Sequence, residues 1–251
     1  MNKKKMQVIK YVVLVFSLFL CYQAVEAHDK GFPNGLYISS KGDVTGDKKT
    51  DMIQLKGKTE GEGRTYKKLS LIIESNRQSV TVPLEGGLHP SIQMADFNHD
   101  KVSDVVILFK SKQDKEPSVK YVYSFLNGKP EKIELPSSVA VMAQFKDHYM
   151  AEISGPEIET AMFDMSARKE QYEKLGLYQK GILNEPAELI VSPPSKVKIK
   201  RFWGRGKGLA FEQVIEGISK KDKIACITSS WIFKDGKWKM LKAEVHPYQV
   251  K

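Results

Sequence analysis

Short segments in which apolar and polar residues alternate follow one another along most of the chain. A period of two is typical of β-strands that bury one face, and short continuous apolar runs are typical of strands buried on both faces. The segments with one of these patterns are 52–56, 67–75, 79–84, 105–110, 119–126, 130–135, 139–145, 149–154, 158–165, 208–218, 224–234 and 237–245. Segment 166–178 begins with serine and has apolar residues at helical spacing, which indicates a short helix. The sequence therefore predicts an all-β protein of antiparallel units with one short helix.

Two acidic loops within this pattern form an internal repeat. They begin at Asp43 and Asp96, so the period is 53 residues (96 − 43), a length typical of propellers and repeat arrays. After each loop the pattern predicts a strand, a long hairpin, a strand, a short hairpin and a strand. The second short hairpin is expected at Asn127-Gly128, because both residues tolerate a positive φ. Four such units would make a small β-propeller-like array.

The N-terminal residues have the features of a secretory signal peptide. Lysines at 3–5 precede an apolar run over 11–20, and Val25-Glu26-Ala27 fits a cleavage site. The apolar run is shorter than the roughly 20 residues of a membrane-spanning helix. We therefore expect cleavage before His28, rather than an uncleaved anchor, and no stable membrane span after processing.

Changes in the pattern divide the chain into four parts. We expect the signal peptide over 1–27, two repeats over 28–138, a degenerate β unit without an acidic loop over 139–192, and a C-terminal β unit over 193–251. Cys226 is then the single cysteine of the mature chain, so an internal disulfide is excluded.

Each acidic loop places three carboxylates within nine residues, where they repel one another unless a cation lies among them. Ca²⁺ takes six to eight oxygen ligands, and alternate positions of a curled loop can all point at one ion. The ligands expected at positions 1, 3, 5, 7 and 9 are Asp43, Thr45, Asp47, the carbonyl of Lys49 and Asp51 in the first loop, and Asp96, Asn98, Asp100, the carbonyl of Val102 and Asp104 in the second. The sequence thus predicts two calcium sites.

The loops differ from EF-hands, because position 12 is Gln54 or Ile107 instead of glutamate and strands follow the loops. In spacing and in the strands that follow, they resemble the calcium-binding loop of FG-GAP or VCBS-type repeats. The resemblance covers residues 41–136 and implies propeller-type β units with calcium in their loops. The C-terminal third fits the family only as degenerate blades.

Lysine replaces the family's glycine at position 6 of both loops, at Lys48 and Lys101. A positive φ costs a non-glycine residue about 1 kcal/mol. One alternative therefore stays open, in which Lys48, Lys49 and Lys101 neutralise the aspartates and the loops are turns without metal. The second loop is the stronger candidate, because Asn98 is a better ligand than Thr45.

The chain is basic, with a formal net charge of +10, and loss of residues 1–27 leaves +7 (10 − 4 + 1). This charge suits an anionic partner such as a wall polymer or glycan, although it also suits solubility alone. Segment 196–208 concentrates the charge around Trp203. It is expected either to bind an anionic polymer, with Trp203 stacking on a sugar, or to be an edge strand whose lysines prevent unwanted pairing.

The sequence contains no catalytic motif and no nucleic-acid-binding motif. We expect an exported, non-enzymatic β-repeat protein with binding or structural function and calcium-stabilised loops, secreted or associated with the cell wall. Its expected partner is an anionic wall polymer, a glycan or another envelope protein, and not nucleic acid. The alternative is a secreted hydrolase with structural calcium and an active site without a recognisable motif.

Overall fold

Two four-stranded antiparallel sheets form the first half of the protein. The computed structural model describes residues 35–59, 65–76, 78–110 and 117–249, and the predicted signal peptide lies outside them. The first sheet has the order β1-β2-β3-β4 and the second the order β5-β6-β7-β8. Their strands are β1 (Gly35–Gly42), β2 (Asp51–Thr59), β3 (Tyr66–Glu74), β4 (Ser79–Glu85), β5 (Leu88–Ala95), β6 (Asp104–Lys110), β7 (Ser118–Ser124) and β8 (Glu131–Lys132).

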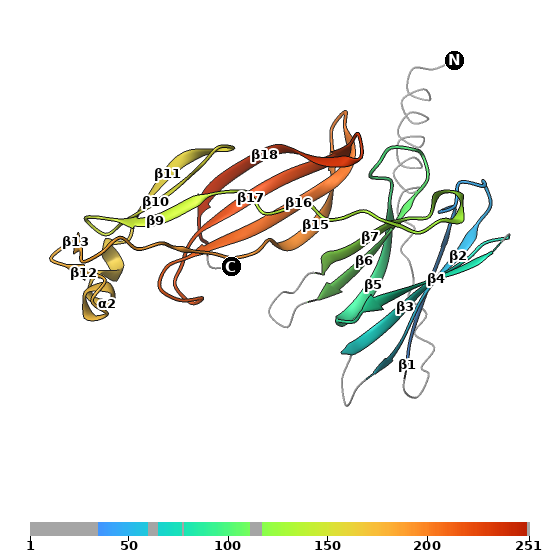
Figure 1. Cartoon of the computed structure of the whole chain (residues 1–251), viewed down its shortest axis with the longest axis horizontal. Coiled ribbons are helices and arrows are strands. Elements are labelled where there is room, and N and C mark those ends of the chain that lie inside the picture. The colour runs from blue at the N-terminus through green and yellow to red at the C-terminus, as the bar shows by residue number, and fades with distance from the viewer. Residues whose placement is uncertain (1–34, 60–64, 77, 111–116, 250–251) are drawn as a thin grey trace, which may run out of the picture.

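The second sheet lies between the first sheet and the C-terminal half of the protein. Strand β6 has a continuous apolar sequence and is buried on both faces. Val105 and Ile107 pack in a core shared with the first sheet, whereas Val106 and Leu108 pack in a core shared with the C-terminal half. Because successive side chains of a strand point to opposite faces, β6 joins the two cores. Figure 1 shows the resulting elongated arrangement.

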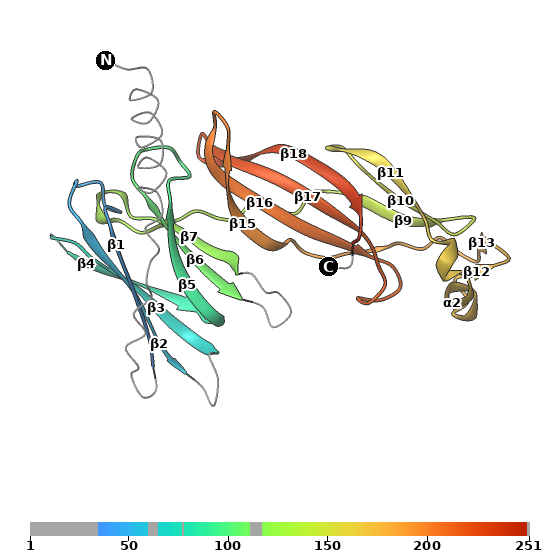
Figure 2. The same cartoon turned by 180° about the vertical axis from the view of Figure 1, so that it is seen from behind.

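A long sheet dominates the C-terminal half. It has the order β14-β16-β17-β18, and β15 also pairs with β16. Figure 2 shows, from behind, that this sheet lies between the two repeat sheets and a three-stranded sheet of order β11-β10-β9. The strands are β9 (Met142–Lys146), β10 (Met150–Gly155), β11 (Ile158–Asp164), β14 (Ile190–Val191), β15 (Ser195–Phe202), β16 (Gly206–Glu216), β17 (Lys223–Lys234) and β18 (Lys237–Pro247).

The remaining elements are short. The turn η1 (Leu126–Gly128) follows β7, η2 (Ser166–Arg168) precedes the helix α2 (Lys169–Lys174), and β12 (Tyr178–Gln179) pairs with β13 (Ile182–Leu183). Within the described ranges, neither α2 nor the 3-10 turns are long and apolar enough to span a membrane.

A buried carboxylate attaches this helix to the long sheet. Asp222, in the turn between β16 and β17, is buried and forms an ion pair with Arg168. Its second oxygen accepts hydrogen bonds from the Tyr172 hydroxyl at 2.9 Å and the Ile218 N–H at 3.0 Å. Burial raises the pKa of Tyr172, so its hydroxyl stays protonated as the donor. The polar groups of this contact therefore satisfy one another.

The all-β prediction and the short helix are confirmed, but two details of the repeat were wrong. A strand, β1 or β5, also precedes each acidic loop, so each unit has four strands and the loop joins its first two. Asn127 and Gly128 do have positive φ values, of 57° and 72°. However, they lie in η1 within a longer connection, because the strands on either side pair only through Ser124–Glu131 and Tyr123–Lys132.

The two predicted C-terminal parts are connected in the structure. Strand β14 belongs to the part predicted over 139–192, yet it pairs with β16 of the part predicted over 193–251. Side chains from both parts pack in the same hydrophobic core, among them Phe145, Ile153 and Ile227.

Candidate metal centre

The two acidic loops occupy equivalent places in their sheets. The first connects β1 to β2, whose register ends with the pair Gly42–Asp51. The second connects β5 to β6, whose register ends with the pair Ala95–Asp104. Each loop is therefore the end of the first hairpin of its sheet, and the two loops differ in position by the 53 residues (96 − 43) of the repeat.

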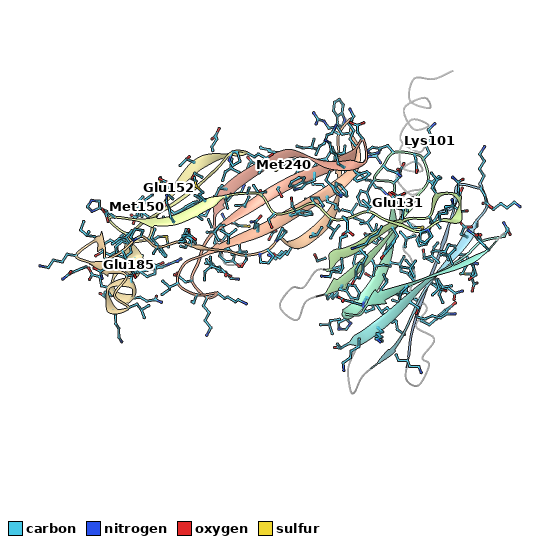
Figure 3. All side chains as sticks on the ribbon, viewed as in Figure 1. Lys101, Glu131, Met150, Glu152, Glu185 and Met240 are labelled. Carbon is cyan, nitrogen blue, oxygen red and sulfur yellow. The ribbon has the colours of Figure 1, made fainter. Side chains whose placement is uncertain are left out.

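The first aspartate of each loop accepts a hydrogen bond from the residue at position 6. The Lys48 N–H donates to Asp43 Oδ2 at 2.9 Å, and the Lys101 N–H donates to Asp96 Oδ2 at 3.2 Å. Both lysines have a positive φ, 63° for Lys48 and 73° for Lys101. Figure 3 shows Lys101 at the outer tip of its loop. Both loops thus retain the left-handed backbone at position 6 that favours glycine.

The last aspartate of each loop is buried and accepts a hydrogen bond from position 2. The Val44 N–H donates to Asp51 Oδ2 at 2.9 Å, and the Phe97 N–H donates to Asp104 Oδ2 at 2.8 Å. The N–H and the hydroxyl of Thr45 also donate to Asp51 Oδ2, each at 3.0 Å. The predicted ligand Thr45 therefore directs its hydroxyl to a neighbouring carboxylate.

The middle aspartates show the same correspondence. The Lys49 N–H donates to Asp47 Oδ1 at 2.8 Å, and the Val102 N–H donates to Asp100 Oδ1 at 2.7 Å. In the second loop Asn98 also donates to Asp100 Oδ2 at 2.8 Å and accepts from the Asp100 N–H at 3.2 Å. Three carboxylate–backbone hydrogen bonds therefore recur at the same positions in both loops.

Two carboxylate oxygens fit a cation. Asp51 Oδ1 and Asp96 Oδ1, one in each loop, are buried without a hydrogen-bond partner among the described residues. The other oxygen of each carboxylate accepts hydrogen bonds, so the unpartnered oxygen costs about 1–3 kcal/mol, and a bound cation would remove that cost. Burial also raises the pKa of Asp104 to about 7, and the negative charges of Asp100 and Asp96 add to the shift. A cation would oppose both effects.

The carboxylates of each acidic loop do not lie around a common point at which a metal ion could bind. Within the described ranges, no three His, Cys, Asp or Glu side chains lie together as a group that could hold a metal ion. The carboxylates instead accept the backbone hydrogen bonds described above. The ligand set fits calcium in its oxygen chemistry, and its carboxylates would have to turn inward on binding.

The two loops contact each other at one end of the repeat sheets. A methyl group added at Gly46, which has a φ of 79°, would lie 3.0 Å from Val102 Cγ2 and 3.1 Å from Leu126 Cδ1. The Asn127 N–H donates to the Thr45 carbonyl at 2.9 Å. The first loop therefore packs against both the second loop and η1.

The second loop also contacts the C-terminal sheet. The ring of Phe97, which is fully buried, meets Trp238 edge to face with 5.5 Å between the ring centroids. A side chain at Gly206 would collide with the His99 ring, and Lys207 Nζ donates to the Met94 carbonyl at 3.3 Å. The second loop thus lies where the repeats join the C-terminal half.

Comparison with known proteins gives a relative for much of the chain. A family model described as the YybI C-terminal domain matches residues 139–246. The uncharacterized protein YybI of Bacillus subtilis (strain 168) is 27% identical over 172 residues, which is 64% of this chain and 64% of that protein. The chain therefore spans less than two thirds of the length of the relative it matches. No solved structure matches the chain.

The family match defines a boundary that agrees with the fold. It begins after the second repeat sheet and ends within β18, so it contains the three-stranded sheet, the helix α2, the β12–β13 pair and almost all of the long sheet. The acidic loops lie outside this matched region. Their resemblance to FG-GAP or VCBS-type repeats stays a prediction.

A groove on the C-terminal sheet was not predicted as a unit. It has a volume of about 520 Å³ and is lined by residues of β15, β16, β17 and β18. The basic segment over 196–208 supplies one side of it and forms β15, as the edge-strand interpretation predicts. Trp203, at the tip of the β15–β16 hairpin, is 99% exposed. Sugar stacking by Trp203 stays a prediction.

Proposed function

We propose that this protein is an exported, non-enzymatic β-repeat protein that binds a partner in the cell envelope or outside the cell, and that calcium stabilises its acidic loops. The observation that supports this proposal most directly is the repeated loop structure. Both loops have the same three carboxylate–backbone hydrogen bonds and the same left-handed position 6. Unrelated turns would have no reason to share these features. Each loop also contains one buried carboxylate oxygen without a partner among the described residues, at position 9 in the first loop and at position 1 in the second.

We propose that the two four-stranded sheets are propeller-type repeats. The two four-stranded sheets have sequential strand order, which is the topology of propeller blades. They stack face to face around a shared core that includes Ile53, Leu71 and Ile107. Together with the loops, this stacking supports the resemblance to FG-GAP or VCBS-type repeats and the description of the chain as a propeller-like array.

Calcium would act as a structural ion in this proposal. Carboxylate oxygens of Asp43, Asp47 and Asp51 would hold it in the first loop, and those of Asp96, Asp100 and Asp104 in the second. The Asn98 side chain and the carbonyls of Lys49 and Val102 would add neutral oxygens, whereas the Thr45 hydroxyl would first have to leave Asp51. The ion would supply positive charge where the carboxylates repel one another.

Thermal unfolding with and without calcium tests the proposal. Extracellular calcium modules bind with constants of about 10⁻⁴–10⁻³ M, and free calcium at about ten times the constant adds roughly 1.4 kcal/mol of stability per site. For a protein of this size we expect the melting temperature to rise by about 3–6 °C per site. Magnesium should stabilise less, because it prefers a smaller octahedral shell.

Single substitutions in the loops show which loop produces the rise in melting temperature that calcium causes. Asp100→Ala should remove more of the calcium shift than Asp47→Ala, because the second loop has the better ligand set. Asp235→Asn is the matched control, since Asp235 is an exposed aspartate in the β17–β18 turn and pairs with Lys239. An unchanged melting temperature in millimolar calcium, together with no heat of binding in calorimetry, would show that the loops are lysine-neutralised turns.

A further inference from the structure

One tryptophan side chain of this protein packs against nothing in the described chain. Trp231 is buried, and its indole N–H donates to the Ser229 hydroxyl at 2.9 Å. The indole N–H of Trp238 donates to the Glu134 carbonyl at 2.7 Å, and its ring meets two phenylalanine rings. Trp203 is 99% exposed and has neither a hydrogen bond nor a ring contact with a described residue. Tryptophan is highly buried on average in folded proteins, so an indole left in water indicates a partner outside this chain.

The hairpin that carries Trp203 is open and convex. Residues 203–205 connect β15 to β16, and Gly204 and Gly206 have positive φ values, of 67° and 85°. A side chain added at Gly204 would meet no atom within 4 Å. Figures 1 and 2 show the hairpin extending outward from the end of the long sheet. Ligand pockets are concave, so this convex tip can enclose no small molecule, and its indole leaves water only when the tip enters a partner.

The end of the sheet around this tip is positively charged. Because β16 and β17 are antiparallel, the β15–β16 hairpin and the β17–β18 turn lie at the same end of the sheet. Segments 201–207 and 234–237 contain one acidic residue, Asp235, which forms an ion pair with Lys239 at 2.5 Å. The basic residues of the two segments are Arg201, Arg205, Lys207, Lys234 and Lys237. Their formal charge is therefore +4 (5 − 1).

Four of these five basic side chains form no ion pair with a described residue. They are Arg201, Arg205, Lys234 and Lys237. All four are exposed, whereas Lys207 donates to the Met94 carbonyl at 3.3 Å. The neighbouring second acidic loop keeps Asp96 and Asp100 half-buried. The exposed charge without a partner at this end of the sheet is therefore positive.

The side chains of the tip distinguish between anionic partners. Sugar hydroxyls both donate and accept hydrogen bonds, but arginine, lysine and tryptophan side chains are donors only, and segment 201–207 contains no side chain that accepts. A soluble anionic polymer without apolar groups would pair with the cations and leave the indole in water. The interface of a bilayer with anionic lipids supplies negative headgroups, acceptors for the indole N–H and an apolar layer for its ring.

We propose that this end of the long sheet binds the surface of a membrane that contains anionic lipids, with Trp203 inserted at the level of the headgroups. The four exposed basic residues would pair with the negative headgroups around it. The inference rests on the proposed binding function in the cell envelope and gives that function a partner class. A single inserted indole with a few basic residues gives weak and reversible binding.

Vesicles made of phosphatidylglycerol and phosphatidylcholine in equal parts test the proposal. The protein should sediment with these vesicles, should not sediment with pure phosphatidylcholine, and should dissociate as salt is added. Nitroxide groups near the top of the acyl chains should quench tryptophan emission in the bound protein. Trp203→Ala should abolish this quenching and weaken binding about tenfold, because an indole has a large apolar surface to insert. Its thermal stability should equal that of the unaltered protein, because the side chain contacts no described residue.

Charge variants test the basic residues separately from the indole. Arg201→Ala/Arg205→Ala should weaken binding about 25-fold, since each basic residue near an anionic surface contributes about fivefold. Lys220→Ala/Lys221→Ala is the charge-matched control, because both lysines are exposed in the β16–β17 turn at the opposite end of the same sheet. This control should leave binding within about twofold of the unaltered protein. An equal loss in both double variants would show non-specific attraction and overturn the proposal.

Leu175→Ala is the control for the loss of an exposed apolar side chain. Leu175 is 62% exposed and follows α2, which Figure 1 shows at the far end of the protein from the β15–β16 hairpin. This variant should bind vesicles like the unaltered protein. All variants are compared in the same form of the chain, so that residues 1–27 contribute equally where they are retained. A loss in Leu175→Ala as large as that in Trp203→Ala would overturn the assignment to the hairpin.

Other partners of the tip give different results. Tryptophan emission that stays unquenched in the bound protein would place Trp203 outside the bilayer and refute the insertion. Binding of hyaluronate, a soluble anionic glycan, that equals vesicle binding and also depends on Trp203 would replace the lipid by a glycan. A dimer in analytical ultracentrifugation that Trp203→Ala converts to a monomer would assign the tip to a second copy of this chain.

The rise in melting temperature with calcium is measured on the same preparations. A calcium-stabilised protein that does not bind the anionic vesicles would refute this inference and leave the calcium proposal standing. Vesicle binding that depends on Trp203 in a protein without a calcium shift would support this inference and refute the calcium proposal. The two proposals can therefore fail independently.

Discussion

Replacing Lys48 by glycine should stabilise the protein, and this prediction tests the backbone geometry of the acidic loops directly. Lys48 has a φ of 63° and an exposed side chain. A left-handed backbone costs an L-residue roughly 1–2 kcal/mol, whereas glycine loses about 0.5–1 kcal/mol more backbone entropy on folding. The net gain for Lys48→Gly is therefore about 0–1.5 kcal/mol, with a central value of about 0.75 kcal/mol.

The neighbouring residue provides a matched control. Lys49 is also an exposed lysine, and its φ lies outside the left-handed region. Lys49→Gly removes the same charge and adds the same flexibility, but it relieves no strain, so it should destabilise the protein by about 0.5–1 kcal/mol. The two variants should thus differ in sign although their chemistry is identical.

Urea unfolding in the presence of a chelator measures this difference without a contribution from calcium. The midpoint of Lys48→Gly should lie above that of the unaltered protein and the midpoint of Lys49→Gly below it, with similar slopes. Lys101→Gly should behave like Lys48→Gly, because Lys101 has a φ of 73° at the equivalent position. Equal destabilisation by Lys48→Gly and Lys49→Gly would refute the reasoning.

Three further predictions concern the packing and the processing of the chain. Phe97→Ala and Phe125→Ala should each lower the free energy of unfolding by about 3–5 kcal/mol, because both rings are fully buried. Only Phe97→Ala should change tryptophan emission, since Phe97 contacts Trp238, and identical emission spectra would contradict that contact. Asp222→Ala should lower the free energy of unfolding in urea by about 3–5 kcal/mol, because it leaves Arg168 without its partner. Tyr172→Phe removes one hydrogen bond and should cost about 1 kcal/mol. A larger loss of stability in Tyr172→Phe than in Asp222→Ala would contradict the role of the carboxylate. The intact mass of exported protein should correspond to a chain that begins at His28, and a product that retains residues 1–27 or is lipidated at Cys21 would contradict the signal peptide.

The loops and most long strands could be predicted because their signals are local. The spacing of Asp96, Asp100 and Asp104 can be read within nine residues, and β6 follows as an uninterrupted apolar run. Asp235 and Gly236, which separate the predicted strand segments 224–234 and 237–245, form a turn in which both residues have positive φ values, of 56° and 73°. Such features need no knowledge of the rest of the chain.

The first strand of each repeat was missed because its own sequence is a weak strand signal. β1 is rich in glycine and serine, and β5 contains Pro90, which removes a backbone donor. β5 is an edge strand with an irregular register between Leu88 and Ser91, which is where proline is tolerated in a sheet. Pairing with β2 and β6 therefore determines these strands more than their propensity does.

The groove was missed for a different reason. Its two walls come from β15 and β18, and their lysines meet in one row only through the registers of three strand pairs. The lysines of the basic segment were visible in the sequence, but Ser230 and Lys242 carry no local signal that connects them to it. A site assembled by register cannot be read from spacing along the chain.

The position of the second loop gives its proposed ion a role beyond the loop itself. Phe97, His99 and Met94 lie in or next to this loop, and each contacts the C-terminal sheet. Asp96 precedes and Asp104 follows the segment that contains Phe97 and His99. An ion bound by both carboxylates would therefore limit the motion of the loop that contacts the C-terminal half. A disulfide cannot supply this restraint within the described chain, because Cys226 is its single cysteine. The first loop contacts the second loop and η1, so its ion would act on the repeats. The two proposed sites are therefore not equivalent in effect, although their backbones are: the second joins the repeats to the groove-bearing sheet, and its loss should be felt in both halves of the protein.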